Sequence, residues 1–247
     1  MSALRRLARK LAPMPLRLAI AVTRRTLSDW RKQPAFATET ADAAARTGLE
    51  LAVTIAQPIR RTAHFEGKLH NLTLAARKLD GLTVPPGSTV SFWHVIGRPI
   101  EARGFQTGRA IVNDRLGADV GGGLCQVASL LYELGLRGGM TIAERHPHSR
   151  DLYTEDTRFT PLGLDAAIVW GFKDVRWQNP HAQDVVLSFN VEGETLHGSL
   201  LSATPIPAYD LTIARHDEGT SRHVEVTRRP GTDRSVISRE TYVIDPT

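Results

Sequence analysis

The single cysteine is the feature that most limits how this chain can fold. Cys125 is the only cysteine among the 247 residues, so neither an internal disulfide nor a metal site made of cysteines alone can form. The fold must instead depend on a buried apolar core, and a domain of about 150 residues is large enough to bury one. Cys125 follows Gly121-Gly122-Gly123-Leu124 and precedes apolar residues at helical spacing: Val127, Leu130, Leu131 and Leu134. The pattern predicts a helix with the thiol in its first turn.

A thiol in this position suits a nucleophile. The first helical turn offers unpaired N–H groups and the positive end of the helix dipole, and both favour the thiolate. Gly122 and Gly123 can adopt backbone conformations that point successive N–H groups at one anion. Together with the Cys125 N–H and the Gln126 side chain, this turn could hold an oxyanion. The alternative is a small buried cysteine after a glycine turn, with Gln126 on the helix surface.

Two histidines downstream of the helix are candidate bases. His146-Pro147-His148 follows the strand-like apolar run Met140-Thr141-Ile142-Ala143. Because proline holds the residue before it extended, the two imidazoles should point in different directions, and only one should face Cys125. We favour His148, since the hydroxyl of the adjacent Ser149 could help to orient it.

A carboxylate should orient the base, and Asp165 is the nearest well-placed one. It opens the apolar strand pattern Ala167-Ile168-Val169-Trp170, and a turn or strand-edge aspartate is its alternative role. Arg145 or Arg150 could bind a substrate carboxylate through paired N–H groups. These residue types predict a Cys-His-Asp arrangement with a basic residue beside it.

A zinc site is the competing use of the same side chains. A thiolate and two imidazoles, from Cys125, His146 and His148, are ligands that Zn²⁺ accepts. A nucleophile at the start of a helix already accounts for the cysteine. We therefore expect no metal and no other cofactor.

Five segments of the chain resemble the successive blocks of the VanW family in their order and spacing. They are Ser91-Phe92-Trp93-His94-Val95-Ile96-Gly97, Arg103-Gly104-Phe105, Gly121-Gly122-Gly123-Leu124-Cys125-Gln126-Val127, Glu144-Arg145-His146-Pro147-His148-Ser149 and Asp165-Ala166-Ala167. The resemblance covers about Asn71 to Gly198. It implies that Cys125 is the family's cysteine, that His146 and His148 are its histidine block, and that Asp165 is its following aspartate.

The resemblance implies cell-wall chemistry, because some VanW family members are understood to be L,D-transpeptidases that use a cysteine. The expected partner is then a peptidoglycan stem peptide or its precursor, and the reaction is acyl transfer or hydrolysis. The alternative is a non-catalytic protein of the cell envelope, linked to glycopeptide resistance, that binds wall peptides. A thiolate pKa well below about 8.5 would favour the enzyme over the binding protein.

Residues 1–32 differ in character from the rest of the chain. They hold nine basic residues against one acid, a net charge of +8, whereas the whole chain carries +5 and the remainder therefore −3. Leu4, Leu7, Leu11, Leu18 and Leu27 fall near helical spacing among the arginines, with a break at Pro13-Met14-Pro15. This pattern predicts an amphipathic helix at an anionic membrane surface, or a helix packed on the domain. No aromatic pattern accompanies the charge, so we expect no nucleic-acid partner.

The sequence predicts four segments: the basic region 1–32, a connector 33–65, a VanW-like domain 66–200 and a strand-rich extension 201–247 of the same domain. The apolar run in the basic region is too short to span a bilayer, and no cleavage site for a signal peptide follows it. These features predict a cytoplasmic location or a peripheral one at the membrane.

Hydrophobic periodicity predicts an α+β fold in which an antiparallel sheet packs against the helix that carries the cysteine at its N-terminus. A further helix is expected over Leu69–Leu79, with Gly81 ending it. We expect a hairpin between Ala166–Phe172 and Val175–Trp177. The other expected strands lie at 51–55, 89–95, 108–116, 141–144, 185–191, 211–213, 223–227 and 239–244.

Overall fold

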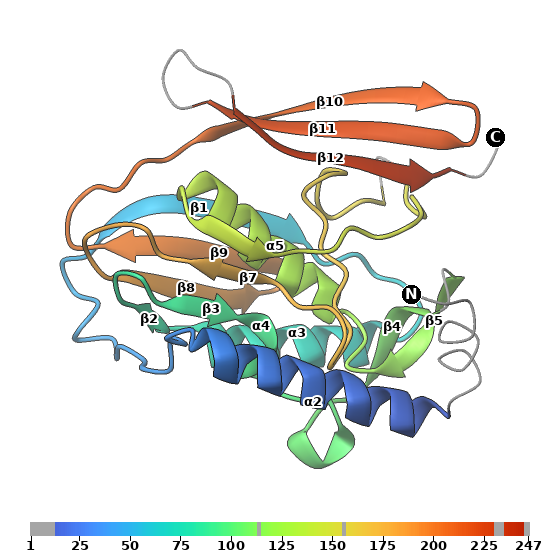
Figure 1. The fold of residues 1–247 in the computed structure, drawn as a ribbon, viewed down its shortest axis with the longest axis horizontal. Helices are drawn as coiled ribbons and strands as arrows, with labels where there is room; N and C mark the ends of the chain where they lie inside the picture. Colours follow the sequence, from blue (N-terminus) through green and yellow to red (C-terminus); the bar gives the residue numbers. More distant parts are fainter. Residues whose placement is uncertain (1–12, 113–114, 155–156, 230–234, 245–247) are drawn as a thin grey trace.

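The protein has a mixed α+β fold with four antiparallel sheets rather than the single sheet that the sequence predicted (Figure 1). The computed structural model describes residues 13–112, 115–154, 157–229 and 235–244. The elements are α2 (Met14–Lys32), β1 (Glu50–Pro58), α3 (Phe65–Leu79), β2 (Thr83–Val84), β3 (Thr89–Ser91), α4 (Phe92–Ile96), the 3₁₀ turn η1 (Glu101–Arg103), β4 (Thr107–Val112), β5 (Arg115–Val120), α5 (Leu124–Arg137), β6 (Thr141–Glu144), β7 (Arg176–Gln178), β8 (Val185–Glu192), β9 (Thr195–Ser202), β10 (Asp210–Glu218), β11 (Ser221–Arg229) and β12 (Ser235–Val243).

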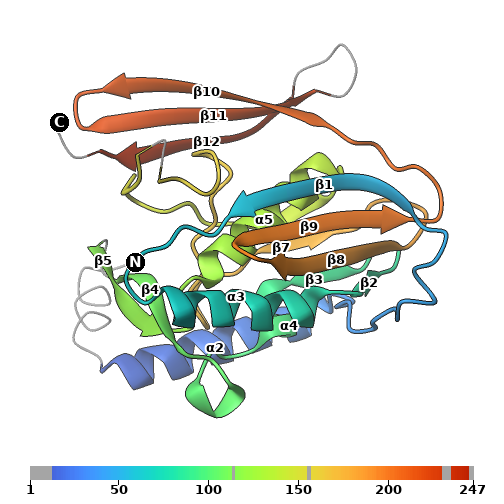
Figure 2. The ribbon, with the colours of Figure 1, turned by 180° about the vertical axis from the view of Figure 1, so that it is seen from behind.

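Helix α5 packs across the largest sheet, whose strand order is β1-β9-β8-β2. Gly198 allows the close approach, because a Cβ there would lie 2.9 Å from Leu130 Cδ2 and 3.0 Å from Leu134 Cδ1. Leu130 and Leu134 are fully buried, and burying one such side chain contributes about 1.5–3 kcal/mol. Helix α3 packs beside α5 and also contacts β8 (Figure 2). The apolar core thus fixes the direction of α5, and with it the position of Cys125.

The predicted hairpin between Ala166–Phe172 and Val175–Trp177 is wrong. Strand β7 pairs with β3 and β6 instead, and residues 166–172 form an irregular segment with one isolated bridge, Val169 to Lys173. The backbone N–H groups of this segment are used elsewhere: that of Ala166 donates to Ser129 Oγ at 2.8 Å and that of Ala167 to the His146 carbonyl at 2.8 Å. The segment is therefore held by single contacts rather than by a ladder.

Two other strand predictions were only partly right. The expected strand 108–116 is instead two paired strands, β4 and β5, and residues 113–114 between them lie outside the described residues. The expected strand 89–95 ends at Ser91, whose hydroxyl accepts a hydrogen bond from the His94 N–H at 3.1 Å and caps the short helix α4. Strand β9 was not predicted at all, although it is the central partner of β1 and β8.

The last three strands, β10, β11 and β12, form a separate antiparallel sheet that lies beyond α5 in both views (Figures 1 and 2). All three were expected from the sequence, and β12 contacts the segment after β6, because the Val243 N–H donates to the Ser149 carbonyl at 3.0 Å. The C-terminal sheet therefore borders the loop that carries the two candidate histidines.

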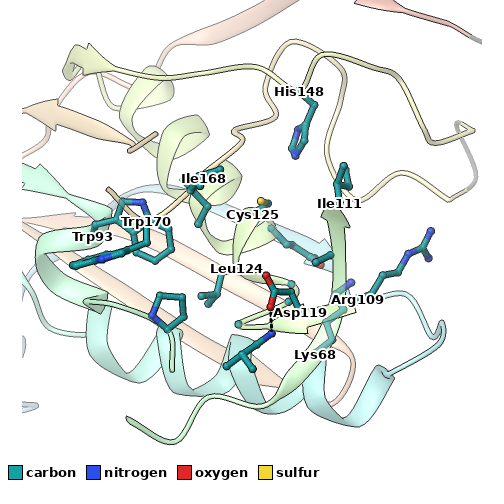
Figure 3. A pocket seen from close by; sticks show the side chains of 18 of the residues that line it. Lys68, Trp93, Arg109, Ile111, Asp119, Leu124, Cys125, His148, Ile168 and Trp170 are labelled. Atoms are coloured by element: carbon teal, nitrogen blue, oxygen red, sulfur yellow. Dashed lines mark hydrogen bonds between the residues drawn. The ribbon is translucent and has the colours of Figure 1, made fainter. Parts of the chain in front are cut away.

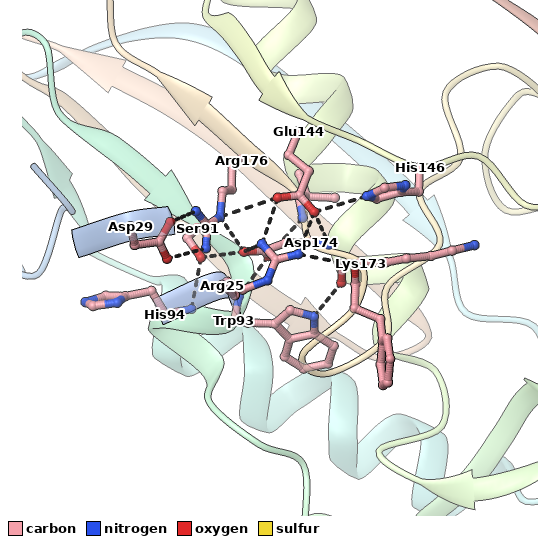
Figure 4. A network of polar contacts seen from close by, with 12 residues as sticks. Arg25, Asp29, Ser91, Trp93, His94, Glu144, His146, Lys173, Asp174 and Arg176 are labelled. Carbon is pink, nitrogen blue, oxygen red and sulfur yellow. Dashed lines mark hydrogen bonds and ion pairs between the residues drawn. The ribbon is translucent and has the colours of Figure 1, made fainter. Parts of the chain in front are cut away.

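Helix α2 lies along the opposite edge of the molecule and is attached mainly by ion pairs (Figure 4). Arg25 donates to both oxygens of Glu144 at 2.7 and 2.8 Å, and Arg176 pairs with Asp29 at 2.6 and 3.0 Å. The expected apolar residues before Pro13 lie outside the described part of the chain. No helix among the described residues is both long and apolar enough to cross a bilayer.

Candidate active site

Cys125 is the second residue of α5, and its side chain is half-buried. Gly123 precedes the helix as its N-cap with φ 99°, a left-handed conformation that a side chain would strain. The Cys125 carbonyl accepts a hydrogen bond from Ser129 Oγ at 2.7 Å, and this hydroxyl also accepts from the Ala166 N–H. The first turn of the helix is thus joined to the segment that carries Asp165.

The structure brings His148 and Asp165 to the thiol. His148 Nδ1 lies 2.7 Å from Asp165 Oδ2, and the same oxygen accepts the His148 backbone N–H at 2.9 Å. With Nδ1 used in this way, the other ring nitrogen is left for Cys125, whose sulfur lies near enough to raise the pKa of His148. The three side chains come from α5, from the loop after β6 and from the segment before β7.

The electrostatics of the three groups favour a thiolate beside an imidazolium. Burial raises the pKa of the Cys125 thiol, but the polar influence and charge of nearby His148, together with the nearby Ile168 N–H, lower it further than burial raises it. Burial lowers the pKa of His148, but Asp165 and Cys125 raise it to about 10. Burial also opposes ionisation of Asp165, yet His148 and Arg145 hold the pKa of that carboxyl well below its usual range.

Arg145 does not face the cavity as a substrate clamp, as the sequence had suggested. Its side chain is 4 % exposed and donates to the Asp165 carbonyl at 2.8 Å, to Asp165 Oδ1 at 3.2 Å and to Glu240 Oε1 at 2.5 Å. Asp165 Oδ1 also accepts a 2.6 Å hydrogen bond from the Tyr242 hydroxyl. Arg145 and Tyr242 therefore hold the carboxylate in place, because they satisfy the oxygen that His148 leaves unused.

His146 and Ser149 lie away from the thiol. His146 Nε2 is 3.0 Å from Glu144 Oε1, within the network of Arg25, Asp174 and Arg176 that attaches α2 (Figure 4). Ser149 is exposed, and its carbonyl accepts from the Val243 N–H. The two imidazoles point in different directions on either side of Pro147, and the one beside Cys125 is His148.

The glycine turn supplies backbone donors rather than the expected glutamine. Gln126 is 1 % exposed, and its side-chain amide donates to the Pro58 carbonyl at 3.0 Å. Gly122 must lack a side chain, since a Cβ there would lie 2.1 Å from the Gly108 carbonyl oxygen of β4. Among the described residues, the N–H groups of Gly123 and Cys125 have no backbone partner. These two N–H groups are the candidate oxyanion donors.

A cavity of about 780 Å³ opens at Cys125 and His148 (Figure 3). Trp93, Trp170 and Phe172 line one part of it, together with Met14 and Leu18 of α2. Lys68, Arg109 and Tyr153 line another part. The glycine turn 121–123 also lines the cavity. The volume is in the range of pockets that hold drug-sized ligands, about 300–1,000 Å³, and it suits part of a peptide.

The described residues contain no group of three or more His, Cys, Asp or Glu side chains that could bind a metal ion. His146, which the zinc alternative needed, is directed at Glu144 instead of Cys125. The structure therefore does not bring the three expected zinc ligands together.

Several residues that shape the site were not recognised in the sequence. Tyr242 and Ser129 act from β12 and from the middle of α5, and the Ile168 N–H lies in a segment expected to be a strand. Nothing local marks a buried tyrosine hydroxyl as the partner of a distant aspartate. Lys68 lies one residue before the helix expected over Leu69–Leu79, and only the tertiary structure places it in α3 and in the cavity.

Comparison with known proteins agrees with the arrangement of these residues. The family model described as VanW like protein matches residues 67–201. The uncharacterized protein YoaR of Bacillus subtilis (strain 168) is 33% identical over 141 residues, which are 57% of this chain and 45% of that protein. The vancomycin B-type resistance protein VanW of Enterococcus faecalis (strain ATCC 700802 / V583) is 34% identical over 114 residues, 46% of this chain and 42% of that protein.

The chain thus spans less than half the length of these two curated relatives. No solved structure matches it significantly. The matched residues include α3, the glycine turn, Cys125, His148 and Asp165. Since the family model covers more than half of the sequence, the chain belongs to the VanW family.

Proposed function

We propose that this chain is a cysteine acyltransferase of the L,D-transpeptidase type, acting on peptidoglycan stem peptides or their precursors. The observation that carries the proposal is the proximity of His148, held by Asp165, to the Cys125 thiol, whose pKa it lowers, beside a cavity large enough for part of a peptide. The substrate class is supported by membership of the VanW family and by the resemblance of its sequence blocks.

In the first half-reaction, the Cys125 thiolate attacks the carbonyl carbon of a donor amide. Charge develops on the carbonyl oxygen, where the N–H groups of Gly123 and Cys125 would stabilise it. The C–N bond then breaks as the His148 imidazolium gives its proton to the leaving amine. The products are a thioester on Cys125 and a free amine.

In the second half-reaction, an acceptor amine attacks the thioester carbonyl. His148 takes up the proton of that amine, and the C–S bond breaks to return the Cys125 thiolate. The product is a new amide, which is a cross-link if the amine belongs to a second stem peptide. If water attacks instead, the product is a carboxylic acid and the same residues act as a hydrolase.

Defined muropeptides and mass spectrometry test this proposal. The native protein should form an adduct on Cys125 and cross-linked or shortened peptides, whereas Cys125→Ala should form neither. Equal product from both proteins would contradict the role of the thiol.

The alternative is a binding protein for wall peptides without turnover. It predicts that muropeptides bind the native protein and Cys125→Ala equally well, and that neither form yields product. Binding without product would favour this alternative over the enzyme.

We also propose that α2 contacts an anionic membrane surface. Its exposed apolar residues lie on the face directed away from the domain, and basic residues accompany them. These outward apolar residues are Leu16, Ile20, Leu27 and Trp30. Leu18 and Val22 face the other way, towards Gly171, where a Cβ would lie 2.9 Å from each. A helix with one face docked and an apolar, basic face outward is suited to an interface.

A further inference from the structure

Lys68 of α3 is a buried cation that has no acidic partner among the described residues. It is 8 % exposed, lines the cavity and has no ion pair, and burial together with the charge of Arg109 lowers its pKa to about 8. Burying an ammonium group costs free energy unless a counter-charge or hydrogen bonds compensate it. At neutral pH the cavity therefore contains a charge that the protein itself does not neutralise.

The position of Lys68 connects this charge to the candidate catalytic turn. A Cβ on Gly123 would lie 2.7 Å from Lys68 Cγ, so the lysine stem passes against the residue that caps α5. Gly123 is two residues before Cys125, and both line the same cavity. Figure 3 shows Lys68 and Arg109 on one side of Cys125 and the Trp93–Trp170 pair on the other.

Arg109 adds a second positive charge to this side of the cavity. Its guanidinium lies 5.8 Å from the centre of the Tyr153 ring, and the charges of both Arg109 and Cys125 act on the pKa of the Tyr153 hydroxyl. Tyr153 thus lies near both the cation and the sulfur. Half-buried Arg109 has no ion pair among the described residues.

The acids of the cavity do not neutralise these cations. Asp119 is exposed, its Oδ1 accepts from the Val120 N–H at 2.8 Å, and it forms no ion pair with Lys68 or Arg109. Besides Cys125 and His148, whose opposite charges cancel, the charged residues that line the cavity are the cations Arg60, Lys68, Arg98 and Arg109 and the acids Glu101 and Asp119. The lining is positive overall. Two of its cations contact the glycine turn: Lys68 of α3 lies against Gly123, and the backbone of Arg109 in β4 lies against Gly122.

We propose that Lys68 and Arg109 form a subsite that binds a carboxylate of the acyl substrate next to Cys125. The proposal deepens the proposed function and rests on it, since it assigns the substrate class as peptides with a free carboxylate near the amide that the thiol attacks. The guanidinium can donate two parallel N–H bonds to the carboxylate, and the ammonium supplies the buried counter-charge. The aromatic side of the cavity is left for an apolar part of the peptide.

The subsite can be tested without any turnover. Iodoacetate and iodoacetamide alkylate the same thiol, but only iodoacetate carries a carboxylate. The rate constant of iodoacetate divided by that of iodoacetamide, both second-order and measured with Cys125 at pH 7, therefore measures how strongly the site attracts an anion. His148 contributes to that ratio equally in every variant that retains it.

The ratio should fall by roughly tenfold in Lys68→Gln and in Arg109→Gln, the size expected for one nearby charge removed from a partly buried site. Arg77→Gln is the matched control, since Arg77 is exposed on the same helix and does not line the cavity. Arg109→Lys should restore much of the ratio, because it returns the charge. Thermal melts show which variants are folded. If Lys68→Gln does not fold, the test depends on Arg109→Gln, since Arg109 is only half-buried.

Two outcomes would overturn the subsite. One is an unchanged ratio in folded Arg109→Gln and Lys68→Gln. The other is an equal fall in Arg77→Gln, which would indicate the general charge of the protein. A fall confined to the cavity variants would support the subsite even if muropeptides gave no product, so failure of the subsite and failure of the acyltransferase can be told apart.

Discussion

The proton state of the Cys125 thiol depends on a few neighbouring groups. Burial favours the neutral thiol, whereas His148 and the Ile168 N–H favour the thiolate and outweigh burial. His148 in turn keeps its proton because Asp165 accepts from Nδ1 at 2.7 Å. These contacts therefore favour a thiolate and an imidazolium side by side over a wide range of pH.

Alkylation and acyl transfer should depend on pH in different ways. As the pH rises through the lowered pKa of Cys125, thiolate forms and both rates should rise, with a midpoint below about 8.5. As the pH rises further, through about 10, His148 loses its proton. Acyl transfer needs that proton and should fall, whereas iodoacetamide alkylation does not need it and should stay level.

The control for this pH dependence is His148→Gln. It removes the imidazolium, so the alkylation midpoint should move up towards the usual thiol value. A native midpoint at or above about 8.5, or one that does not move in His148→Gln, would contradict the ion pair.

Substitution of the two histidines should have unequal effects. His148→Ala should lower acyl transfer to muropeptides by roughly 10²-fold or more, because it removes the general acid and base. His146→Ala should leave the alkylation midpoint unchanged, since His146 contacts Glu144 rather than the thiol. Steady-state rates and alkylation profiles measure both effects. A loss of the lowered midpoint in His146→Ala alone would reverse the assignment.

The sequence could identify Cys125, His148 and Asp165 because each stands in a short pattern with a chemical reason: a helix start, an X-Pro-X step and a strand opening. It could not identify the role of Arg145, whose contacts with Glu240 and Tyr242 span 95 and 97 residues. An arginine that binds substrate and a buried arginine that holds a carboxylate differ only in the residues packed around them. A local sequence pattern does not contain that information.

At the scale of elements, α2 combines two unlike faces. On the face directed at the domain, Arg25 forms an ion pair with Glu144, and Asp29 forms one with Arg176. Met14 and Leu18 of the same face line the cavity. The outer face exposes Leu16, Ile20 and Leu27, with Trp30 71 % exposed. A soluble helix gains nothing from an apolar outer face, whereas a helix at a membrane does.

Vesicle binding separates these roles of α2. The native chain should sediment with anionic vesicles at low salt, and binding should weaken as salt rises, because arginine attraction to headgroups is worth about 1 kcal/mol each and is screened. Ile20→Glu with Leu27→Glu should abolish binding and leave the thermal melt unchanged, since both residues face outward. Absence of native binding, or a large fall in melting temperature in this variant, would contradict the membrane role.

Regular elements with strong periodicity could be predicted, and those shaped by single tertiary contacts could not. The helix expected at 69–79 is present but begins at Phe65. The earlier start could not be predicted, because the N-cap residue His64 has φ 59° and its side chain makes no capping hydrogen bond. The segment 166–172 has strand-like composition, yet its N–H groups serve Ser129, His146 and Cys125. Tertiary contacts there outweigh local β-propensity.

At the scale of the whole molecule, the C-terminal sheet supports the site. Its strand β12 supplies Tyr242, which donates to Asp165 at 2.6 Å, and Glu240, which accepts from Arg145. Burial raises the pKa of the Tyr242 hydroxyl, so it remains a donor across the working range of pH. The sheet therefore contributes to the site although none of its residues lines the cavity beside Cys125.

Tyr242→Phe should test this support. It removes one hydrogen bond to a buried carboxylate and should lower the free energy of unfolding by about 1.5–3 kcal/mol. Urea unfolding measures the change, and Thr241→Val, exposed on the same strand, should change stability little. Equal effects of the two substitutions would indicate that the hydroxyl does not support Asp165.

The contact between Tyr242 and Asp165 also has a consequence for protein synthesis. Tyr242 follows Asp165 by 77 residues, so a ribosome adding about 5–20 residues per second needs on the order of 4–15 s to make the intervening chain. During that interval the carboxylate lacks one of its donors, and the histidine that depends on it is not yet fixed. The loop that carries His148 therefore reaches its final contacts only when the last sheet has folded against it.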